Sequence, residues 1–477
     1  MSVTETPQTG TRQTAPDAAP RGLDGATDVL VDWVVSAQQA ALPPEVEHHV
    51  RRLLVDYMAA VIPGSATDVA RAVAGHVAAT YGVTDRAATA VGLGRVSAPG
   101  AAFLNGTSAH SLEVDDGYTP GSVHPSSVCF PAVLAAAEAR GSDTPTTMRA
   151  LAVALETVSR LAAAGHPATW RNHFHNTPLT GVVGAACGVA VLHGLDADRL
   201  HDALGIAASH AGGLFAFLGK DAEVKRVHPG KAARDAIVSV ELAAAGVTGP
   251  RPILETPHGY VEAFADGGFD AGTLLDGLGE RWVVLGSYVK PYPSCRHLHG
   301  PIDAVRALRA ALGIGAADVA RVDVATYTVA SHHAGTTVEA LLDAQMSIPF
   351  AVATALVHDE VGLTEFGPDA RRDAAVLDLV GRVHVRADEQ ADADYPVLRT
   401  AVVTLTLYDG RELTERVPLP YGEPGNPVSD EEMTAKLVRL ATPVTGRDAA
   451  TALAERLWAF TSLDVVARTD EYCRGVA

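Results

Sequence analysis

The chain of 477 residues has few cysteines and few aromatic residues, and both shortages exclude classes of protein. Its four cysteines, Cys129, Cys187, Cys295 and Cys473, are far apart and form no CxxC pair. This spacing argues against a disulfide framework and against cysteine cradles for zinc or an iron–sulfur cluster, and it fits a reducing cytoplasm. Aromatic residues make up 5% of a chain that is 47% hydrophobic. The apolar residues are therefore mostly small and aliphatic, which predicts a mainly α fold.

The sequence also lacks a basic excess and a long apolar run. A formal net charge of -19 does not suit binding to nucleic acid or to an anionic membrane. The longest nearly apolar run, residues 181–192, is too short to cross a bilayer. Residues 1–26 are rich in Pro, Thr, Gly and Ala, which predicts a disordered tail without the apolar segment of a signal peptide. We expect a cytoplasmic protein that binds neither nucleic acid nor a membrane.

The pattern of the chain predicts two structural units, because the sequence is too long for one compact core. Helical periodicity dominates residues 27–285 and returns in residues 421–477. Residues 286–420 contain a helical segment followed by strand-like segments, and the last strand pair has an Asp409-Gly410 turn typical of a hairpin. We expect a large all-helical domain formed by both chain ends, with a smaller α/β lid domain inserted at residues 286–420.

Titratable side chains are concentrated between residues 105 and 127, at and beyond the end of a predicted helix. Two histidines, His110 and His124, and three carboxylates, Glu113, Asp115 and Asp116, occur there. A helix end can bring such groups to the floor of a cavity, where burial and charged neighbours adapt them to chemistry. The alternative is a solvated acidic loop.

Basic residues form further groups in this acidic chain. Residues 287–299 contain Lys290, Arg296 and His297, and His175 stands directly before a helix rich in glycine and alanine. A basic segment in an acidic protein suits binding of a carboxylate or a phosphate. The alternative explanation for these basic residues is a turn on the protein surface. For His175 the alternative is a helix-capping or core role. The densest basic group consists of Lys220, Lys225, Arg226, His228, Lys231 and Arg234.

These segments resemble the MmgE/PrpD superfamily, which includes 2-methylcitrate dehydratase, cis-aconitate decarboxylase and iminodisuccinate epimerase. The resemblance extends over nearly the whole chain. It rests on an ordered series of motifs: NGTSAHSLEVDD with HPSS, FHNTPLTGVVGAA, VKRVHPGKAAR, KPYPSCRHLHGPIDA, DAQMSIPFAVATAL and GEPGNPVSDEEM. It implies a homodimer in which the active site lies in the cleft between the helical domain and the lid.

The resemblance also implies roles for individual residues. By position, His124 and His175 are expected to be catalytic histidines that move a proton, and Lys225 and Lys290 are expected to stabilise a carbanionic substrate. The expected substrate-binding residues are His110, Glu113, Asp116, Arg296 and His297. This sequence departs from the family pattern at two places, since Glu113 stands where aspartate is common and Gly117 where threonine is common. We therefore do not assume that this protein acts on the tricarboxylate substrates of the family.

Our first hypothesis is a lyase without cofactor or metal that dehydrates a small di- or tricarboxylate, as 2-methylcitrate dehydratase does. A cis-aconitate-type decarboxylase or an epimerase using the same residues is the close rival. A non-catalytic carboxylate-binding protein is an alternative from another class. A metal hydrolase using His110, Asp115 and His124 is a third, although these residues lack a compact ligand spacing. A thiol nucleophile at Cys295, two residues before His297, is the weakest alternative.

Overall fold

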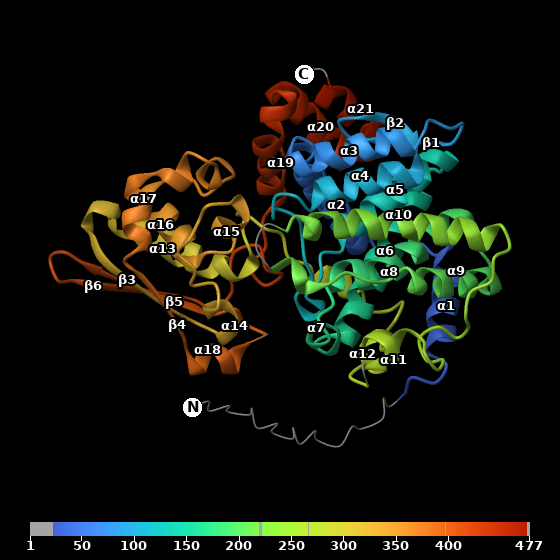
Figure 1. Cartoon of the computed structure of the whole chain (residues 1–477), viewed down its shortest axis with the longest axis horizontal. Helices are drawn as coiled ribbons and strands as arrows, with labels where there is room; N and C mark the ends of the chain where they lie inside the picture. The colour runs from blue at the N-terminus through green and yellow to red at the C-terminus, as the bar shows by residue number, and fades with distance from the viewer. Residues whose placement is uncertain (1–21, 219–221, 266, 396, 475–477) are drawn as a thin grey trace, which may run out of the picture.

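The computed structural model describes residues 22–218, 222–265, 267–395 and 397–474. Most of the expected disordered tail thus lies outside the described residues, and helix α1 (Ala26–Ala37) already begins at the last residue of that tail. Figure 1 shows a larger helical unit beside a smaller unit that contains a sheet. The predicted mainly α fold is confirmed.

Helices from both ends of the chain build the larger unit. Side chains between Ala26 and Val289 and between Val428 and Val466 form one apolar core, and the C-terminal helix α19 packs on α2 (Figure 1). The C-terminal helices therefore complete a core that the N-terminal helices begin. Besides α1, the helices are α2 (Pro44–Gly64), α3 (Asp68–Thr80), α4 (Ala98–Ala109), α5 (Ser126–Arg140), α6 (Thr144–Gly165), α7 (Ala168–Arg171), α8 (Asn176–His193), α9 (Ala197–Ser209), α10 (Val224–Ala244), α11 (Tyr260–Phe264), α12 (Ala271–Leu275), α19 (Asp430–Thr445), α20 (Arg447–Ala459) and α21 (Asp464–Arg474).

The smaller unit has its own apolar core and a four-stranded sheet in the order β4-β3-β5-β6. β3 and β4 are parallel, and the other neighbours are antiparallel. The predicted hairpin turn is present, with Gly410 at φ 88° between β5 and β6. The elements are α13 (His299–Leu312), β3 (Val319–Thr326), α14 (Thr328–Ser331), α15 (Leu341–Gln345), α16 (Ile348–Val357), α17 (Ala374–Val380), β4 (Val383–Ala387), α18 (Glu389–Asp394), β5 (Ala401–Leu407) and β6 (Glu412–Val417).

One local feature differs from the sequence-based expectation. The larger unit is not entirely helical, because β1 (Ala87–Ala90) and β2 (Gly94–Ser97) form a short antiparallel hairpin. The hairpin is short and local, and it leaves the overall architecture unchanged.

Two facing glycines let helix α10 approach α4 closely. A Cβ atom on Gly230 of α10 would collide with the carbonyl oxygen of Phe103, and one on Gly106 of α4 would collide with the backbone of Gly230. Because no side chains separate the two helices, the first turn of α10 lies next to the chain that leaves the end of α4. This contact brings Lys225 to the loop that begins at His110.

Among the described residues, no single helix is both long and apolar enough to cross a membrane. The pair α2 and α3 meets the length and composition requirement only when the two are counted together, and the chain bends by 87° between them.

Candidate active site

The candidate site is built on the loop that leaves α4. His110 is the C-terminal cap of this helix, and the next helix, α5, begins at Ser126. Within the loop, Glu113 has a φ of 56°, which is uncommon for a residue with a side chain. His110, Asp115 and Asp116 are almost completely buried, so the loop is not the solvated acidic segment considered as an alternative.

Asp115 holds two histidines close together. Its carboxylate lies 2.7 Å from His110 Nδ1 and 3.6 Å from His124 Nδ1. Burial alone would raise the pKa of Asp115, but His110 and His124 outweigh it and hold the pKa below its ordinary value. His124 Nδ1 also lies 2.6 Å from the carbonyl oxygen of Asp116, which fixes Nδ1 as the protonated nitrogen. Nε2 of His124 is therefore the nitrogen that can accept a proton.

Burial controls the charge of His124 and of Asp116. It lowers the pKa of His124 to about 3, so the ring is neutral at pH 7. It also raises the pKa of Asp116 well above its ordinary value, and the nearby carboxylates of Asp56 and Asp115 add to this effect. One oxygen of Asp116 accepts the backbone N–H of Ser126 at 3.1 Å. Asp116 thus joins the loop to the start of α5.

Two lysines from distant parts of the chain meet at Glu113. Lys225 comes from α10 and Lys290 from the segment that leads into the smaller unit, and each ammonium group forms an ion pair with the Glu113 carboxylate, at 3.0 Å in the case of Lys290. Burial would raise the pKa of Glu113, but the two lysines outweigh it and hold the pKa well below its ordinary value. Burial opposes the charge on Lys290, yet Glu113 and Asp115 raise the pKa of its ammonium group. Two positive charges therefore face one carboxylate in a buried space.

His175 completes the cluster at the N-terminal cap of α8. Its ring centroid lies 5.9 Å from that of His110, and its Nδ1 lies 3.1 Å from Nδ1 of His228. Burial lowers the pKa of His175 well below its ordinary value, with His110 and Lys225 adding to the effect. Burial likewise lowers the pKa of His228 to about 4. The cluster thus contains three histidines, His110, His124 and His175, next to the two lysines, and His228 lies behind His175.

Only part of the basic segment at residues 220–234 reaches the cluster. Lys225 and His228 reach the cluster, as described. Arg226 pairs with the exposed Glu223, and Arg234 pairs with Asp235. Lys231 donates to the carbonyl oxygen of His210. Lys220 lies outside the described residues. In the sequence, only its position in a basic segment pointed to His228. Its side chain comes close to His175 because α8 packs against α10.

Arg296 is buried, and its guanidinium binds other protein groups. It forms an ion pair with Glu423 at 2.9 Å, donates to the carbonyl oxygen of Tyr421, and contacts His299 at 2.8 Å. It also lies 4.9 Å above the ring of Tyr288. These contacts tie the segment after Lys290 to residues 420–423 and occupy most of the donors that a substrate would need.

His297 and Cys295 form a group with His333 that adjoins Lys290, which helps to lower the pKa of both His297 and Cys295. His297 Nδ1 contacts the Tyr327 hydroxyl at 2.6 Å, and Cys295 Sγ lies 3.9 Å from His333 Nε2. Burial would raise the pKa of Cys295, but His333 outweighs it, and the pKa falls to about 7. Cys295 therefore interacts with His333, which the sequence did not connect to it.

The position of Tyr288 accounts for the glycine at residue 117, where the family commonly has threonine. Gly117 and Tyr288 exchange backbone hydrogen bonds of 3.1 and 2.8 Å. A Cβ atom on Gly117 would collide with the hydroxyl end of the Tyr288 side chain. A larger residue at this position would push Tyr288 and the following Lys290 away from the loop.

The arrangement of His110, Asp115 and His124 also bears on the metal-hydrolase alternative. One potential ligand atom from each lies within 4.8 Å of the others, although the sequence spacing gave no sign of it. The physical surroundings do not favour a cation, because Lys290 is close enough to lower the pKa of His124. The geometry fits proton transfer better than metal binding.

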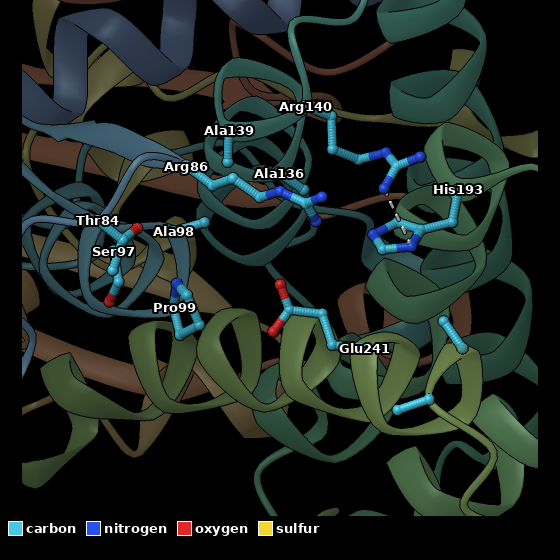
Figure 2. Close-up of a pocket in the computed structure, with 12 residues that line it drawn as sticks. Thr84, Arg86, Ser97, Ala98, Pro99, Ala136, Ala139, Arg140, His193 and Glu241 are labelled. Atoms are coloured by element: carbon cyan, nitrogen blue, oxygen red, sulfur yellow. Dashed lines mark hydrogen bonds between the residues drawn. The ribbon is translucent and has the colours of Figure 1, made fainter.

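A cavity of about 590 Å³ lies elsewhere, between the ends of α5, α8 and α10. Figure 2 shows Arg86, Arg140, His193 and Glu241 around it, and Arg140 Nη1 contacts His193 Nδ1 at 3.4 Å. Arg140 belongs to the last turn of α5, where its positive charge offsets the negative end of the helix dipole, and His193 belongs to the last turn of α8. The cavity shares no residue with the histidine–lysine cluster.

The burial of His193 beside this cavity predicts how the stability of the protein changes with pH. Burial lowers the pKa of His193 to about 4, and Arg140 and Arg86 add to the effect. An unfolded histidine titrates near about 6.5. Between these values the unfolded chain binds a proton that the folded protein does not, so the free energy of unfolding falls as the pH drops from about 7 to about 4. We expect the urea midpoint of His193→Gln to fall less between pH 7 and pH 5 than that of the wild type, and an equal fall would contradict this assignment.

Comparison with known proteins agrees with this architecture. Residues 28–271 match the MmgE/PrpD N-terminal domain, and residues 292–459 match the MmgE/PrpD C-terminal domain. A protein named cis-aconitate decarboxylase from Aspergillus terreus is 27% identical over 460 residues, which cover 91% of this chain and 92% of that protein. The human protein of the same name is 24% identical over 443 residues, 87% of each chain. The chain belongs to the MmgE/PrpD family.

Proposed function

We propose that this MmgE/PrpD family protein is a lyase that forms a carbanion-like intermediate next to a carboxylate of a small di- or tricarboxylate. The observation that carries the proposal is the convergence of Lys225 and Lys290 on one carboxylate, Glu113, among buried neutral histidines. A pair of buried ammonium groups is suited to a carboxylate ligand. Decarboxylation of a cis-aconitate-type substrate is our first candidate, because relatives aligned along most of the chain carry that name.

The two lysines would act on the charge that develops in the reaction. Loss of CO₂, or removal of a proton next to a carboxylate, moves negative charge onto carboxylate oxygens. Lys225 and Lys290 are 7% and 1% exposed, so few water molecules compete with them. Fixed positive charge in such a dry site stabilises the transition state more than it would in water.

The histidines would move the proton. After decarboxylation the carbanion must be protonated, and His124 or His175 can supply the proton once protonated. Both are neutral in the free protein, because burial lowers the pKa of each. A bound substrate brings negative charge, which raises a histidine pKa again. We assign His124 Nε2 to proton transfer, since Nδ1 is engaged by Asp116.

Dehydration of a hydroxylated tricarboxylate is the second candidate. It needs a base to remove the first proton, and neutral His124 and His175 are already in the form that accepts one. The same lysines would stabilise the same type of intermediate. The residues therefore suit either reaction, and the substrate distinguishes them.

In this proposal Glu113 is a resident carboxylate and not a direct substrate ligand. It holds both lysines in place in the substrate-free protein. A substrate carboxylate that approaches the lysines must share their charge with Glu113. Such sharing favours substrates that carry fewer negative charges at this end of the site.

Incubation of the purified protein with two substrates tests the proposal. We expect CO₂ release from cis-aconitate if the protein is a carboxy-lyase, and a new ultraviolet absorbance of an alkene from 2-methylcitrate if it is a hydro-lyase. Calorimetric binding of each compound provides the control. Binding that is weakened by Lys225→Ala and His175→Ala, without turnover of any carboxylate, would instead identify a non-catalytic carboxylate-binding protein.

A further inference from the structure

Two buried arginines lie beside Tyr288, which precedes Lys290 in the chain. Arg296 follows Lys290 in the same segment, whereas Arg399 comes from the segment that leads into β5. The guanidinium groups of Arg296 and Arg399 lie 4.9 and 5.9 Å from the centroid of the Tyr288 ring. Burial raises the pKa of Tyr288 to about 12, and Lys290 and both arginines are close enough to oppose this rise. Three cations therefore lie around one tyrosine at the edge of the candidate active site.

The two arginines differ in how fully their donors are used. Arg296 is bound to Glu423, to two backbone carbonyl oxygens and to a histidine. Among the described residues, the guanidinium of Arg399 makes one hydrogen bond, from Nη2 to the hydroxyl of Thr119 at 3.2 Å, and its Nε makes none. A buried donor without a partner costs stability, and a guanidinium carries several donors. Arg399 therefore has donors to offer to a bound anion.

The charges of the two arginines are only partly balanced. Glu423 Oε1 lies 2.9 Å from Arg296 Nε and 3.8 Å from Arg399 Nε. In the part of the chain that the structure describes, neither guanidinium forms an ion pair with any other carboxylate. Two buried positive charges thus share one negative charge. A buried charge without a full partner is costly, and a carboxylate bound at Arg399 would remove this cost.

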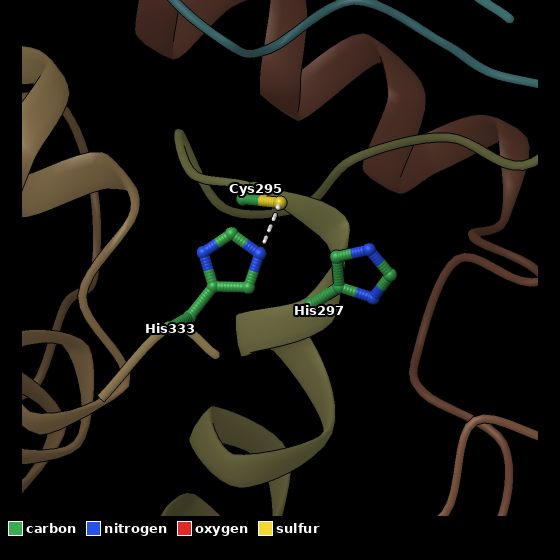
Figure 3. Close-up of side chains that lie close together, drawn as sticks. All are labelled: Cys295, His297 and His333. Carbon is green, nitrogen blue, oxygen red and sulfur yellow. Dashed lines mark hydrogen bonds between the residues drawn. The ribbon is translucent and has the colours of Figure 1, made fainter. Parts of the chain in front are cut away.

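His297 provides a neutral hydrogen-bond donor beside Arg399. Figure 3 shows the Cys295 thiol directed at a ring nitrogen of His333, with the His297 ring next to them. Burial lowers the pKa of His297 well below its ordinary value, and Arg399 adds to the effect, so this ring is neutral at pH 7. Its Nδ1 lies 2.6 Å from the hydroxyl of Tyr327. A phenol is a stronger donor than a neutral imidazole, so we assign the ring proton of His297 to Nε2, which can donate it to a ligand.

From this geometry we infer that Arg399 and His297 bind a second carboxylate of the substrate. The inference rests on the proposed function and adds a specificity determinant to it. A substrate held by Lys225 of the helical unit and by Arg399 of the smaller unit must carry at least two carboxylates. The planar guanidinium can bind a carboxylate through two parallel hydrogen bonds, and His297 Nε2 would add another. The substrate-binding role that the resemblance implied for Arg296 passes in this way to Arg399.

Calorimetric binding of cis-aconitate and 2-methylcitrate tests the inference without any need for turnover. Arg399→Met keeps much of the length of the side chain but removes the guanidinium. It is expected to weaken binding of both tricarboxylates by about tenfold to a hundredfold, the cost of losing hydrogen bonds to a charged group. Arg399→Lys keeps the positive charge without the planar fork, so its expected loss is about threefold to tenfold. The urea midpoint of each variant shows whether it is folded, and the lysine variant carries the test if the methionine variant is not.

Two control variants separate ligand binding from a structural role. Thr119→Val keeps the shape of the side chain but removes the hydroxyl that accepts from Arg399, which is the contact between Arg399 and the helical unit. Arg306→Met removes a half-buried arginine of the smaller unit that lies on α13, 5.7 Å from the ring centroid of Tyr292. We expect both variants to bind each tricarboxylate within about a factor of two of the wild type, because neither removes a ligand contact.

The outcomes distinguish this inference from the proposed function. Unchanged binding by the folded Arg399 variants would overturn the inference, and turnover by the wild type would then leave the lyase proposal standing. A loss in Thr119→Val as large as that in Arg399→Met would also overturn it, because Arg399 would then act only by joining the two units. Binding that depends on Arg399, without turnover, would support the inference and contradict the lyase proposal. A wild type that binds neither tricarboxylate would contradict both.

Discussion

Lys225→Met is expected to lower kcat/KM by about a hundredfold to a thousandfold, the usual cost of removing one group that stabilises charge in a transition state. Lys225 and Lys290 face the same carboxylate, so the variant leaves Glu113 paired with Lys290 and the fold intact. Methionine keeps most of the length and packing of the lysine side chain. The loss should therefore reflect missing positive charge, measured by steady-state kinetics with the substrate identified in the turnover assay.

Lys231→Met is the matched control for this change. Lys231 lies on the same helix, α10, but its side chain is 39% exposed and its ammonium group donates to the carbonyl oxygen of His210. We expect its kcat/KM to remain within about a factor of two of the wild type, since a partly exposed lysine that does not contact Glu113 adds little to the stabilisation of charge in the reaction. If both variants lost the same activity, the effect would come from a general disturbance of α10, and the role of Lys225 in stabilising the transition state would be contradicted.

His124→Asn is expected to lower kcat by about a hundredfold to ten-thousandfold, the range for loss of a general acid or base. The asparagine amide can still donate to the carbonyl oxygen of Asp116, which now receives the His124 Nδ1–H. The variant therefore keeps the local hydrogen bond but has no nitrogen that exchanges a proton. Kinetics together with binding should show a large fall in kcat and a small change in substrate affinity.

His201→Asn provides a control with similar burial. The side chains of His201 and His124 are 15% and 16% exposed, and His201 lies on α9, where it contacts Asp28. Its replacement should leave kcat unchanged. A kcat for His124→Asn close to that of the wild type would transfer the proton-moving role to His175, whose ring also lies close to His110.

Much of the fold could be predicted from local patterns. The return of helical periodicity after residue 420 predicted the C-terminal helices α19, α20 and α21, and Asp409-Gly410 predicted the turn between β5 and β6. These features depend on neighbours in the sequence, which is why the sequence reveals them. The β1–β2 hairpin escaped prediction, because its strands are short and rich in alanine and glycine.

The candidate site was predictable only in part. Family resemblance pointed to His124, His175, Lys225 and Lys290, and the structure brings them into one connected cluster. Their roles remain predictions until the variants are measured. His228 and His333 escaped attention because each acquires its partner, His175 or Cys295, only through the packing of distant segments.

The sequence by itself determined the helical character of this protein, the inserted sheet unit, the acidic surface and the presence of titratable residues after α4, because composition, periodicity and turn residues act locally. Only the tertiary structure decided which charges meet. Glu113 is separated by more than a hundred residues from each lysine, and it is the close packing of α10 on α4 and the Gly117–Tyr288 contact that brings the three together. Their mutual attraction then sets their protonation, since the two lysines outweigh the effect of burial on Glu113 and hold the pKa of its carboxyl well below the ordinary value.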